Sequence, residues 1–369
     1  MFNRKNATKR IIELLIAGLF TIATIWMIAV SAVQFVNPPP TPTPTPQIVL
    51  PPREVLESSL PLQEAWRWSG ISFPWITPNL VVVDNHIITA ALDYGIGIKL
   101  IAFDAQTGNS VWESEYIQEL TAGSNSFDSI DADNERVYVG TLRNVQAFDL
   151  KTGQLLWVGA KQPREKHGIL NVYFQKNQVE AYSYPDEIIY ILGPTTGETL
   201  NKMEVPGILI KYDDVAYGEY RSNRVWAKSL IGQQQLLWEQ ELGRARIQLW
   251  PLFVDDMMYV LSGSDSGIGD RQIFALSTKT GEIIWQSPPK IASNIAFSRG
   301  RLFAIQADAT IVALDAKTGQ QMGQLTVKPA VTYQNSVNQN QLGYTIGASE
   351  EVIAVYYRDS QELIIFRWE

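Results

Sequence analysis

The feature that constrains this chain most is a short motif that recurs at intervals of about 42 residues. The full motif is an apolar strand that leads through an Asp-x-x-Thr-Gly turn into a second strand ending in Trp. The clear copies are IAFDAQTGNSVW (Ile101 to Trp112), QAFDLKTGQLLW (Gln146 to Trp157) and FALSTKTGEIIW (Phe274 to Trp285), the last with Ser277 in the Asp position. VALDAKTGQQMG (Val312 to Gly323) lacks the Trp, and YILGPTTGETLN (Tyr190 to Asn201) and WAKSLIGQQQLLW (Trp226 to Trp238) are weaker copies. Such units must stack on one another, because one unit cannot bury its apolar face alone.

The turn glycines define the period. Gly108, Gly153, Gly197, Gly281 and Gly319 are separated by 45, 44, 84 and 38 residues, and the longest interval spans two units. Two further apolar runs precede the motif in each unit, as at 80–84 and 86–92. Four short strands in about 42 residues are typical of one propeller blade. Because no sustained helical period follows Pro46, the pattern predicts an all-β fold.

The motif residues have a structural interpretation. The Asp carboxylate can accept hydrogen bonds from turn amides, and the Gly supplies the positive φ that closes the hairpin. The Trp can lie flat between neighbouring blades and bury a large area there, whereas contact with a ligand is its alternative role. The residues assigned structural roles are Asp104, Gly108, Trp112, Asp149, Gly153, Trp157, Trp238, Gly281, Trp285, Asp315 and Gly319.

The number of blades follows from the length of the repeat region. Residues 62–369 have room for about seven units of this period. The strand EAWRWSG (Glu64 to Gly70) has no preceding strands of its own, and the chain ends with the strands QLGYTIG, EVIAVYY and ELIIFRW. We therefore predict that the first strand completes the last blade, which closes the ring and removes its free edges. The prediction is a seven-bladed propeller, with eight blades as the alternative.

The motifs AFDAQTGNSVW, AFDLKTGQLLW and FALSTKTGEIIW resemble the repeats of the PQQ-like β-propeller superfamily over roughly residues 62–369. Its members include quinoprotein alcohol dehydrogenases and BamB-like outer-membrane assembly factors. The resemblance to the dehydrogenases implies a vicinal disulfide, a calcium ion beside the quinone and a catalytic Asp, usually in a much longer chain. This chain has no cysteine, and Asp104, Asp149 and Asp315 already match the structural turn. We therefore expect no catalytic residue, no cofactor and no enzymatic activity.

The N-terminal residues have a different composition. Residues 1–10 form a basic tail, and residues 11–36 contain twenty uncharged residues from Leu14 to Val33. A helix of that length spans roughly 30 Å, the thickness of the bilayer's hydrocarbon core. The basic flank predicts a cytoplasmic N-terminus with the propeller outside the cytoplasm, hence a single-pass protein of the cell membrane. A cleaved signal peptide that ends near Val30-Ser31-Ala32 is the alternative.

Residues 37–61 are the expected Pro-rich linker. The run NPPPTPTPTP from Asn37 to Pro46 favours polyproline II and forms a stiff spacer of roughly 30 Å. The remainder of the linker offers at most a helical turn at Arg53–Leu60. The linker would hold the propeller, residues 62–369, away from the membrane.

Composition excludes several classes of function. Thirty Lys and Arg against 38 Asp and Glu give a net charge of −8, which argues against a nucleic-acid partner. Without cysteine there is no disulfide, no thiolate metal site and no cysteine nucleophile. The chain's two histidines, His86 and His167, have no recognisable partners for a catalytic triad.

Other polar groups receive structural interpretations. Asp265 and Asp270 lie in a Gly-rich loop that lacks the spacing of a calcium loop, so no metal site is predicted there. The pairs Asp213-Asp214 and Asp255-Asp256 are interpreted as turn residues. The basic cluster Lys161, Arg164 and Lys166 is interpreted as an exposed loop that can contact an acidic partner or anionic lipid.

The function that these features favour is a non-catalytic scaffold. We expect a membrane-anchored, extracytoplasmic propeller that binds a protein of the cell envelope, whose identity the sequence does not give. One alternative is a sensory propeller that binds a small molecule or a glycan. A quinoprotein-type oxidoreductase is the less favoured alternative.

Overall fold

The structure is a computed structural model, in which the chain divides into residues 1–43 and residues 44–369. It describes residues 55–69, 80–93, 97–117, 129–141, 143–161, 169–183, 187–204, 208–220, 223–232, 235–243, 246–247, 251–263, 271–327, 344–357 and 360–369. All of these belong to the second unit. In these ranges, no helix has the length and apolarity needed to cross a bilayer. The predicted span Leu14–Val33 lies outside the described residues.

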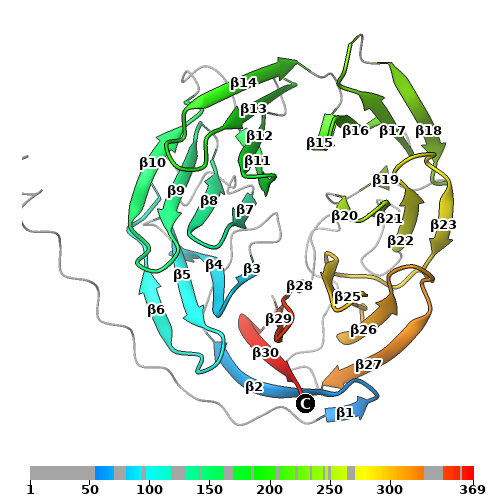
Figure 1. Ribbon diagram of the computed structural model, residues 1–369. Coiled ribbons are helices and arrows are strands. Elements are labelled where there is room, and N and C mark those ends of the chain that lie inside the picture. Colours follow the sequence, from blue (N-terminus) through cyan, green and yellow to red (C-terminus); the bar gives the residue numbers. More distant parts are fainter. Residues whose placement is uncertain are drawn as a thin grey trace, which may run out of the picture. The chain divides into compact units, whose positions relative to one another are not determined.

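The described residues form seven antiparallel sheets arranged as a ring, which confirms the prediction of an all-β propeller with seven blades (Figure 1). Blade 1 contains β3 (Leu80–Val83), β4 (His86–Asp93), β5 (Gly97–Asp104) and β6 (Ser110–Glu113). Blade 2 contains β7 (Ser129–Ala132), β8 (Arg136–Gly140), β9 (Val145–Asp149) and β10 (Leu155–Gly159). Blade 3 contains β11 (Ile169–Gln175), β12 (Gln178–Ser183), β13 (Ile188–Leu192) and β14 (Thr199–Glu204).

In these three blades and in the other four, the strands are given from the innermost to the outermost. Blade 4 contains β15 (Ile208–Tyr212), β16 (Val215–Tyr220), β17 (Arg224–Ser229) and β18 (Leu236–Glu241). Blade 5 contains β19 (Arg246–Ile247), β20 (Leu252–Val254), β21 (Met257–Gly263), β22 (Gln272–Ser277) and β23 (Ile283–Gln286). Blade 6 contains β24 (Ala296–Ser298), β25 (Arg301–Ile305), β26 (Thr310–Asp315) and β27 (Gln321–Val327). Blade 7 contains β28 (Tyr344–Ala348), β29 (Val352–Tyr357) and β30 (Glu362–Trp368), together with β2 (Leu62–Ser69).

The ring closes through β2, as the sequence predicts. This strand pairs antiparallel with β30, and the register runs from Leu62 opposite Trp368 to Ser69 opposite Glu362. Blade 7 is therefore built from both ends of the repeat region, and β2 takes its outermost position (Figure 1). This exchange ties the last blade to the first part of the propeller, so that the ring cannot open without breaking a sheet.

A further strand precedes the closure. Residues Val55–Ser58, which the sequence analysis places in the linker with at most a helical turn, form β1 and pair with β27 at the outer edge of blade 6. Leu60 then packs over Gly323, where an added Cβ would lie 2.6 Å from the Leu60 Cδ2 atom. The linker as predicted therefore ends in a strand of the propeller, because the outer edge of β27 offers unpaired backbone groups to it.

Candidate functional site

Five tryptophans join neighbouring blades. Each donates a hydrogen bond from its indole Nε1 to a carbonyl in the hairpin turn of the next blade, and each is at least nine-tenths buried. The donors and acceptors are Trp66 and Ala105 (3.0 Å), Trp112 and Leu150 (2.7 Å), Trp157 and Pro194 (2.8 Å), Trp238 and Thr278 (2.9 Å), and Trp285 and Ala316 (2.9 Å). The indoles lie against the turn glycines Gly108, Gly153, Gly197, Gly281 and Gly319. Trp66 is not among the predicted tryptophans of this series, although the strand EAWRWSG contains it.

The aspartates of the motif organise the turns. Asp104, Asp149 and Asp315 each accept hydrogen bonds at Oδ1 from the amides two and three residues later and from the Thr hydroxyl. The hydroxyl and the amide of Thr318 lower the pKa of Asp315 below its usual value. These carboxylates are thus engaged in turn geometry, on the hairpins that connect the two outer strands of each blade.

Two junctions between blades lack the indole. Asn201 of blade 3 and Gly323 of blade 6 occupy the position that is Trp in the other blades. They pair with Ile191 and Ala313, as Trp285 pairs with Ala275 in blade 5. Between blades 3 and 4 the fully buried Trp226 of β17 fills the interface instead. Between blades 6 and 7 Leu60 covers Gly323.

The histidines, and the other aspartates and basic residues considered from the sequence, do not belong to this series of turns. His86 is half-buried at the start of β4. Asp213 and Asp255 have positive φ values of 57° and 51° in two-residue turns, as interpreted from the sequence. His167, Arg164, Lys166, Asp265 and Asp270 lie outside the described residues. Among the residues that are described, no three His, Asp or Glu side chains gather into a possible metal site, and no residue is assigned to a metal or a quinone.

The inner strands of blades 2, 3 and 4 are connected by buried polar groups. Asp131 of β7 accepts a hydrogen bond at Oδ2 from the Phe174 amide of β11 (2.6 Å), and Ala132 donates to its Oδ1 (2.8 Å). Glu180 of β12, which is 1% exposed, forms an ion pair with Lys211 of β15 (2.7 Å). Burial raises the pKa of Asp131 to about 6, while the two backbone amides act in the opposite direction and Asp133 adds to the rise.

This half-buried carboxyl group, with its raised pKa, predicts a pH-dependent stability. Because the pKa of Asp131 is higher in the folded protein than in the unfolded chain, the protonated carboxyl group contributes to the free energy of unfolding. This contribution is fully present below pH 3.8 and is lost as the pH rises towards about 6. We expect the stability of Asp131→Asn relative to the wild type to rise by at most about 3 kcal/mol between pH 4 and pH 7. Urea unfolding followed by circular dichroism at both pH values measures it. A difference that is independent of pH would contradict the assigned role of Asp131.

A pocket of about 290 Å³ opens between blades 1 and 2. One wall is the segment that follows β6, where Ile117 donates a backbone hydrogen bond to Ile98 of β5 (2.7 Å). The other wall is the face of β9 and β10 that is turned towards blade 1, with Phe148 packed in the same cluster as Ile117. This size is near the lower end for sites that hold small ligands, and is suited to a few side chains.

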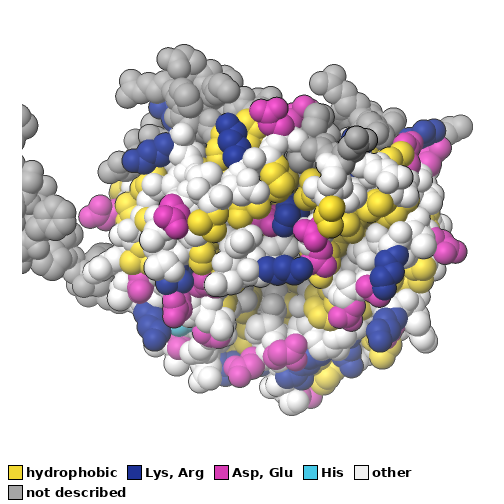
Figure 2. Space-filling view, turned by 45° about the horizontal axis from the view of Figure 1, so that its top comes forward, with side chains coloured by type: hydrophobic (Ala, Val, Ile, Leu, Met, Phe, Trp, Pro, Cys, Tyr) yellow, Lys and Arg dark blue, Asp and Glu magenta, His cyan; other side chains and the backbone are white. Residues whose placement is uncertain are grey.

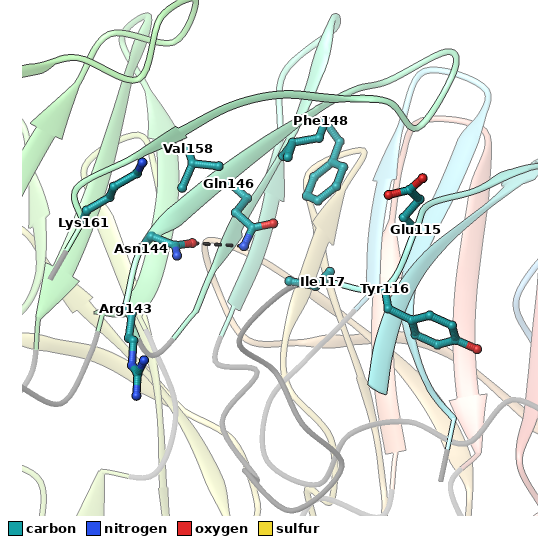
Figure 3. Close-up of a pocket in the computed structure, with 10 residues that line it drawn as sticks. Glu115, Tyr116, Ile117, Arg143, Asn144, Gln146, Phe148, Val158 and Lys161 are labelled. Carbon is teal, nitrogen blue, oxygen red and sulfur yellow. Dashed lines mark hydrogen bonds between the residues drawn. The ribbon is translucent and has the colours of Figure 1, made fainter. Parts of the chain in front are cut away.

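The pocket has a basic side and an aromatic side. Figure 3 shows Arg143 and Lys161 on one side, and Glu115 and Tyr116 on the other. Between them lie the buried amides of Asn144 and Gln146, which are 5% and 4% exposed. Gln146 Nε2 donates to Asn144 Oδ1 (3.1 Å), and Thr141 Oγ1 donates to the same oxygen (3.2 Å). These bonds hold the amides in place, and the floor of the pocket is thereby polar and rigid.

Comparison of the repeats shows that this floor is unusual. Gln146 comes directly before Ala147, the residue of β9 that pairs with Trp157 of β10. Because side chains alternate along a strand, Gln146 faces the preceding blade, blade 1. The corresponding residues of the other six blades are apolar: Ile101, Tyr190, Trp226, Phe274, Val312 and Ile364. A polar residue at a core position that is otherwise apolar departs from the packing rule of the repeat, and such departures are expected at functional sites. Gln146 is not among the predicted site residues, although the difference between QAFD and IAFD is visible in the sequence.

On the face shown in Figure 2, acidic and basic side chains are interspersed, and no broad patch of one sign covers the described residues. In the pocket between blades 1 and 2, by contrast, two cations and two buried amides line one cavity.

Comparison with known proteins identifies the family. The model for the family described as outer membrane protein assembly factor BamB matches residues 63–230 and 185–369, which together make up most of the chain. This chain belongs to the BamB family. The family in turn lies within the PQQ-like repeat propellers, as the resemblance of the repeats indicates.

Solved structures show the same fold. BamB from Moraxella catarrhalis matches the BamB-family propeller described here with a TM-score of 0.50 and 14% identity, over 84% of this chain and 98% of that one. The computationally designed Ika8 protein matches with a TM-score of 0.50 and 14% identity, over 82% and 98%. At this identity the likeness establishes the propeller fold and nothing more specific.

A curated relative shares part of the repeat region. The dehydrogenase subunit of the quinone alcohol dehydrogenase of Acetobacter aceti is 31% identical over 117 residues, which cover 28% of this chain and 15% of the relative. The BamB-family chain therefore spans a small part of that enzyme's length.

Proposed function

We propose that this BamB-family propeller is a non-catalytic scaffold of the cell envelope, anchored in the membrane by its N-terminal segment and placed outside the cytoplasm. Its task is to bind another envelope protein. The observation that carries the proposal is the pocket between blades 1 and 2, where a rigid ring presents polar side chains at a position that the repeat otherwise keeps apolar. A rigid framework suits binding, because little order is lost when the partner docks.

The membrane part of the proposal rests on the sequence. The twenty uncharged residues Leu14–Val33 behind a basic tail, and the proline-rich run that follows them, support a tethered arrangement. With a C-terminal epitope tag on the full chain, protease added to spheroplasts should remove the tag, and inverted vesicles should protect it. The opposite pattern would contradict the proposed orientation.

The binding function is tested by crosslinking in native membranes. The tagged full chain is crosslinked and purified, and the recovered proteins are compared by quantitative mass spectrometry with those from a control that carries residues 1–61 on an unrelated domain. We expect at least one envelope protein to be enriched with the full chain alone. Recovery of the same proteins from both samples would count against the scaffold.

The match with the quinone alcohol dehydrogenase supports a second candidate, a quinoprotein oxidoreductase. The absence of cysteine disfavours it, since the vicinal disulfide implied by the resemblance to the dehydrogenases cannot form. Addition of pyrroloquinoline quinone and Ca²⁺ to the purified chain distinguishes the two. The scaffold proposal predicts an unchanged melting temperature, whereas a clear rise would favour the oxidoreductase.

A further inference from the structure

We infer that the pocket between blades 1 and 2 binds an extended peptide segment of the partner protein in which an acidic side chain stands next to an aliphatic one. The inference rests on the proposed scaffold function and specifies which part of the propeller the partner contacts. It follows from the charges, the amides and the apolar groups that line one and the same cavity.

The cations of the pocket define the sign of the ligand. Many basic side chains of the propeller are paired with acids, as Lys99 is with Glu113 (2.6 Å) and Lys211 with Glu180 (2.7 Å). Arg143 and Lys161 form no ion pair with the described residues. Two cations at one side of a partly enclosed cavity, in a chain of net charge −8, favour a carboxylate.

The amides define the form of the ligand. Asn144 and Gln146 are fixed at the cavity floor by hydrogen bonds, in which the Asn144 side-chain oxygen accepts from Gln146 and from Thr141. Extended peptide backbone presents alternating N–H and C=O groups, which amide side chains can bind in both directions.

The apolar groups define the neighbouring side chain. Leu155 is 51% exposed and Tyr116 is 39% exposed, and both line the cavity together with the half-buried Val158. Their exposed apolar surface is removed from water when an aliphatic side chain docks there. Glu115 lies on the side opposite Arg143 and Lys161, so the acidic residue of the peptide is placed on the side of these two residues (Figure 3).

The test uses the full chain in lipid nanodiscs and a phage-displayed random dodecapeptide library as the probe. We expect the enriched peptides to share an Asp or Glu beside an aliphatic residue. Each peptide is then synthesised with its Gln or Asn counterpart, and fluorescence polarisation measures the affinities. The acidic form should bind at least tenfold more tightly than the amide form.

Variants of the propeller locate the contact. Arg143→Gln/Lys161→Gln should weaken the acidic peptide at least tenfold and abolish its advantage over the amide peptide. Glu115→Gln should bind equally well or better. The control Lys151→Gln/Lys317→Gln removes two exposed lysines from hairpin turns outside the pocket and should change the affinity less than twofold. Thermal melting establishes that each variant is folded.

Three outcomes overturn the inference: no peptide enriched over empty nanodiscs, equal binding of acidic and amide peptides, or weaker binding in Glu115→Gln of the size seen in the double variant. Crosslinking in native membranes separates this failure from that of the scaffold. A partner that is still recovered with the Arg143→Gln/Lys161→Gln chain keeps the scaffold and removes the pocket. Loss of every specific partner from the wild-type chain removes the scaffold itself.

Discussion

Replacement of Trp285 by alanine is expected to lower the free energy of unfolding by about 3–5 kcal/mol, the range for a large buried aromatic side chain. The indole is 9% exposed, donates to the Ala316 carbonyl (2.9 Å) and lies in the cluster that joins blades 5 and 6. Its removal leaves a cavity between two sheets that are held apart by their other contacts. Urea unfolding of the full chain, followed by circular dichroism, measures the change.

The neighbouring residue provides a matched control. Ile284 is on the same strand and is 49% exposed. Ile284→Ala should therefore change the stability by no more than about 0.5 kcal/mol. Equal losses for the two variants would show that the indole contributes nothing special to the contact between blades.

Replacement of Gly319 by alanine should be nearly as destabilising. Gly319 has a φ of 71°, and an added Cβ would lie 2.6 Å from Cδ2 and Cε3 of Trp285. The left-handed backbone costs an L-residue about 1–2 kcal/mol, and the forced displacement of a packed indole adds about 1–3 kcal/mol. We expect a loss of roughly 2–5 kcal/mol.

Two comparisons separate the cost of the left-handed backbone from the cost of the contact between the new Cβ and the indole. Gly300 of the same blade has a φ of 72° and no atom within 4 Å of an added Cβ, so Gly300→Ala should show the backbone cost alone. In a Trp285→Ala background the Gly319→Ala substitution should fall to that same cost, because the indole is gone. Strictly additive losses in the double variant would contradict the contact between the two residues.

The ring could be predicted from the sequence because its determinants are repeated. The Thr-Gly turns and the Trp that follows them recur at one period, and stacking of such units leaves few alternatives to a closed propeller. The closure by the strand at Glu64–Gly70 was predictable as well, since an outer strand without its own blade must pair elsewhere. Trp66 takes the equivalent position in β2 and donates its hydrogen bond from blade 7 to the Ala105 carbonyl of blade 1, where the ring closes.

What escaped prediction depends on single positions. The pairing of β1 with β27 joins residues that are far apart in the chain, and no turn between them fixes the register. Gln146 is a single polar residue at a position that is apolar in the other repeats. Its role becomes visible only when its side chain is placed in the pocket between two blades. The environment of Asp131 likewise includes the amide of Phe174, which lies in the next blade and donates a hydrogen bond to it. Local pattern does not show such contacts.

Site-specific photo-crosslinking in native membranes tests the proposed binding function most directly. The photoreactive residue p-benzoylphenylalanine is placed at Leu155 beside the pocket or at Ile284 on the outer strand of blade 5, two positions that are 51% and 49% exposed. A scaffold that binds its partner between blades 1 and 2 predicts one discrete protein adduct from position 155 and none from position 284. The same adducts from both positions, or none from either, would contradict it.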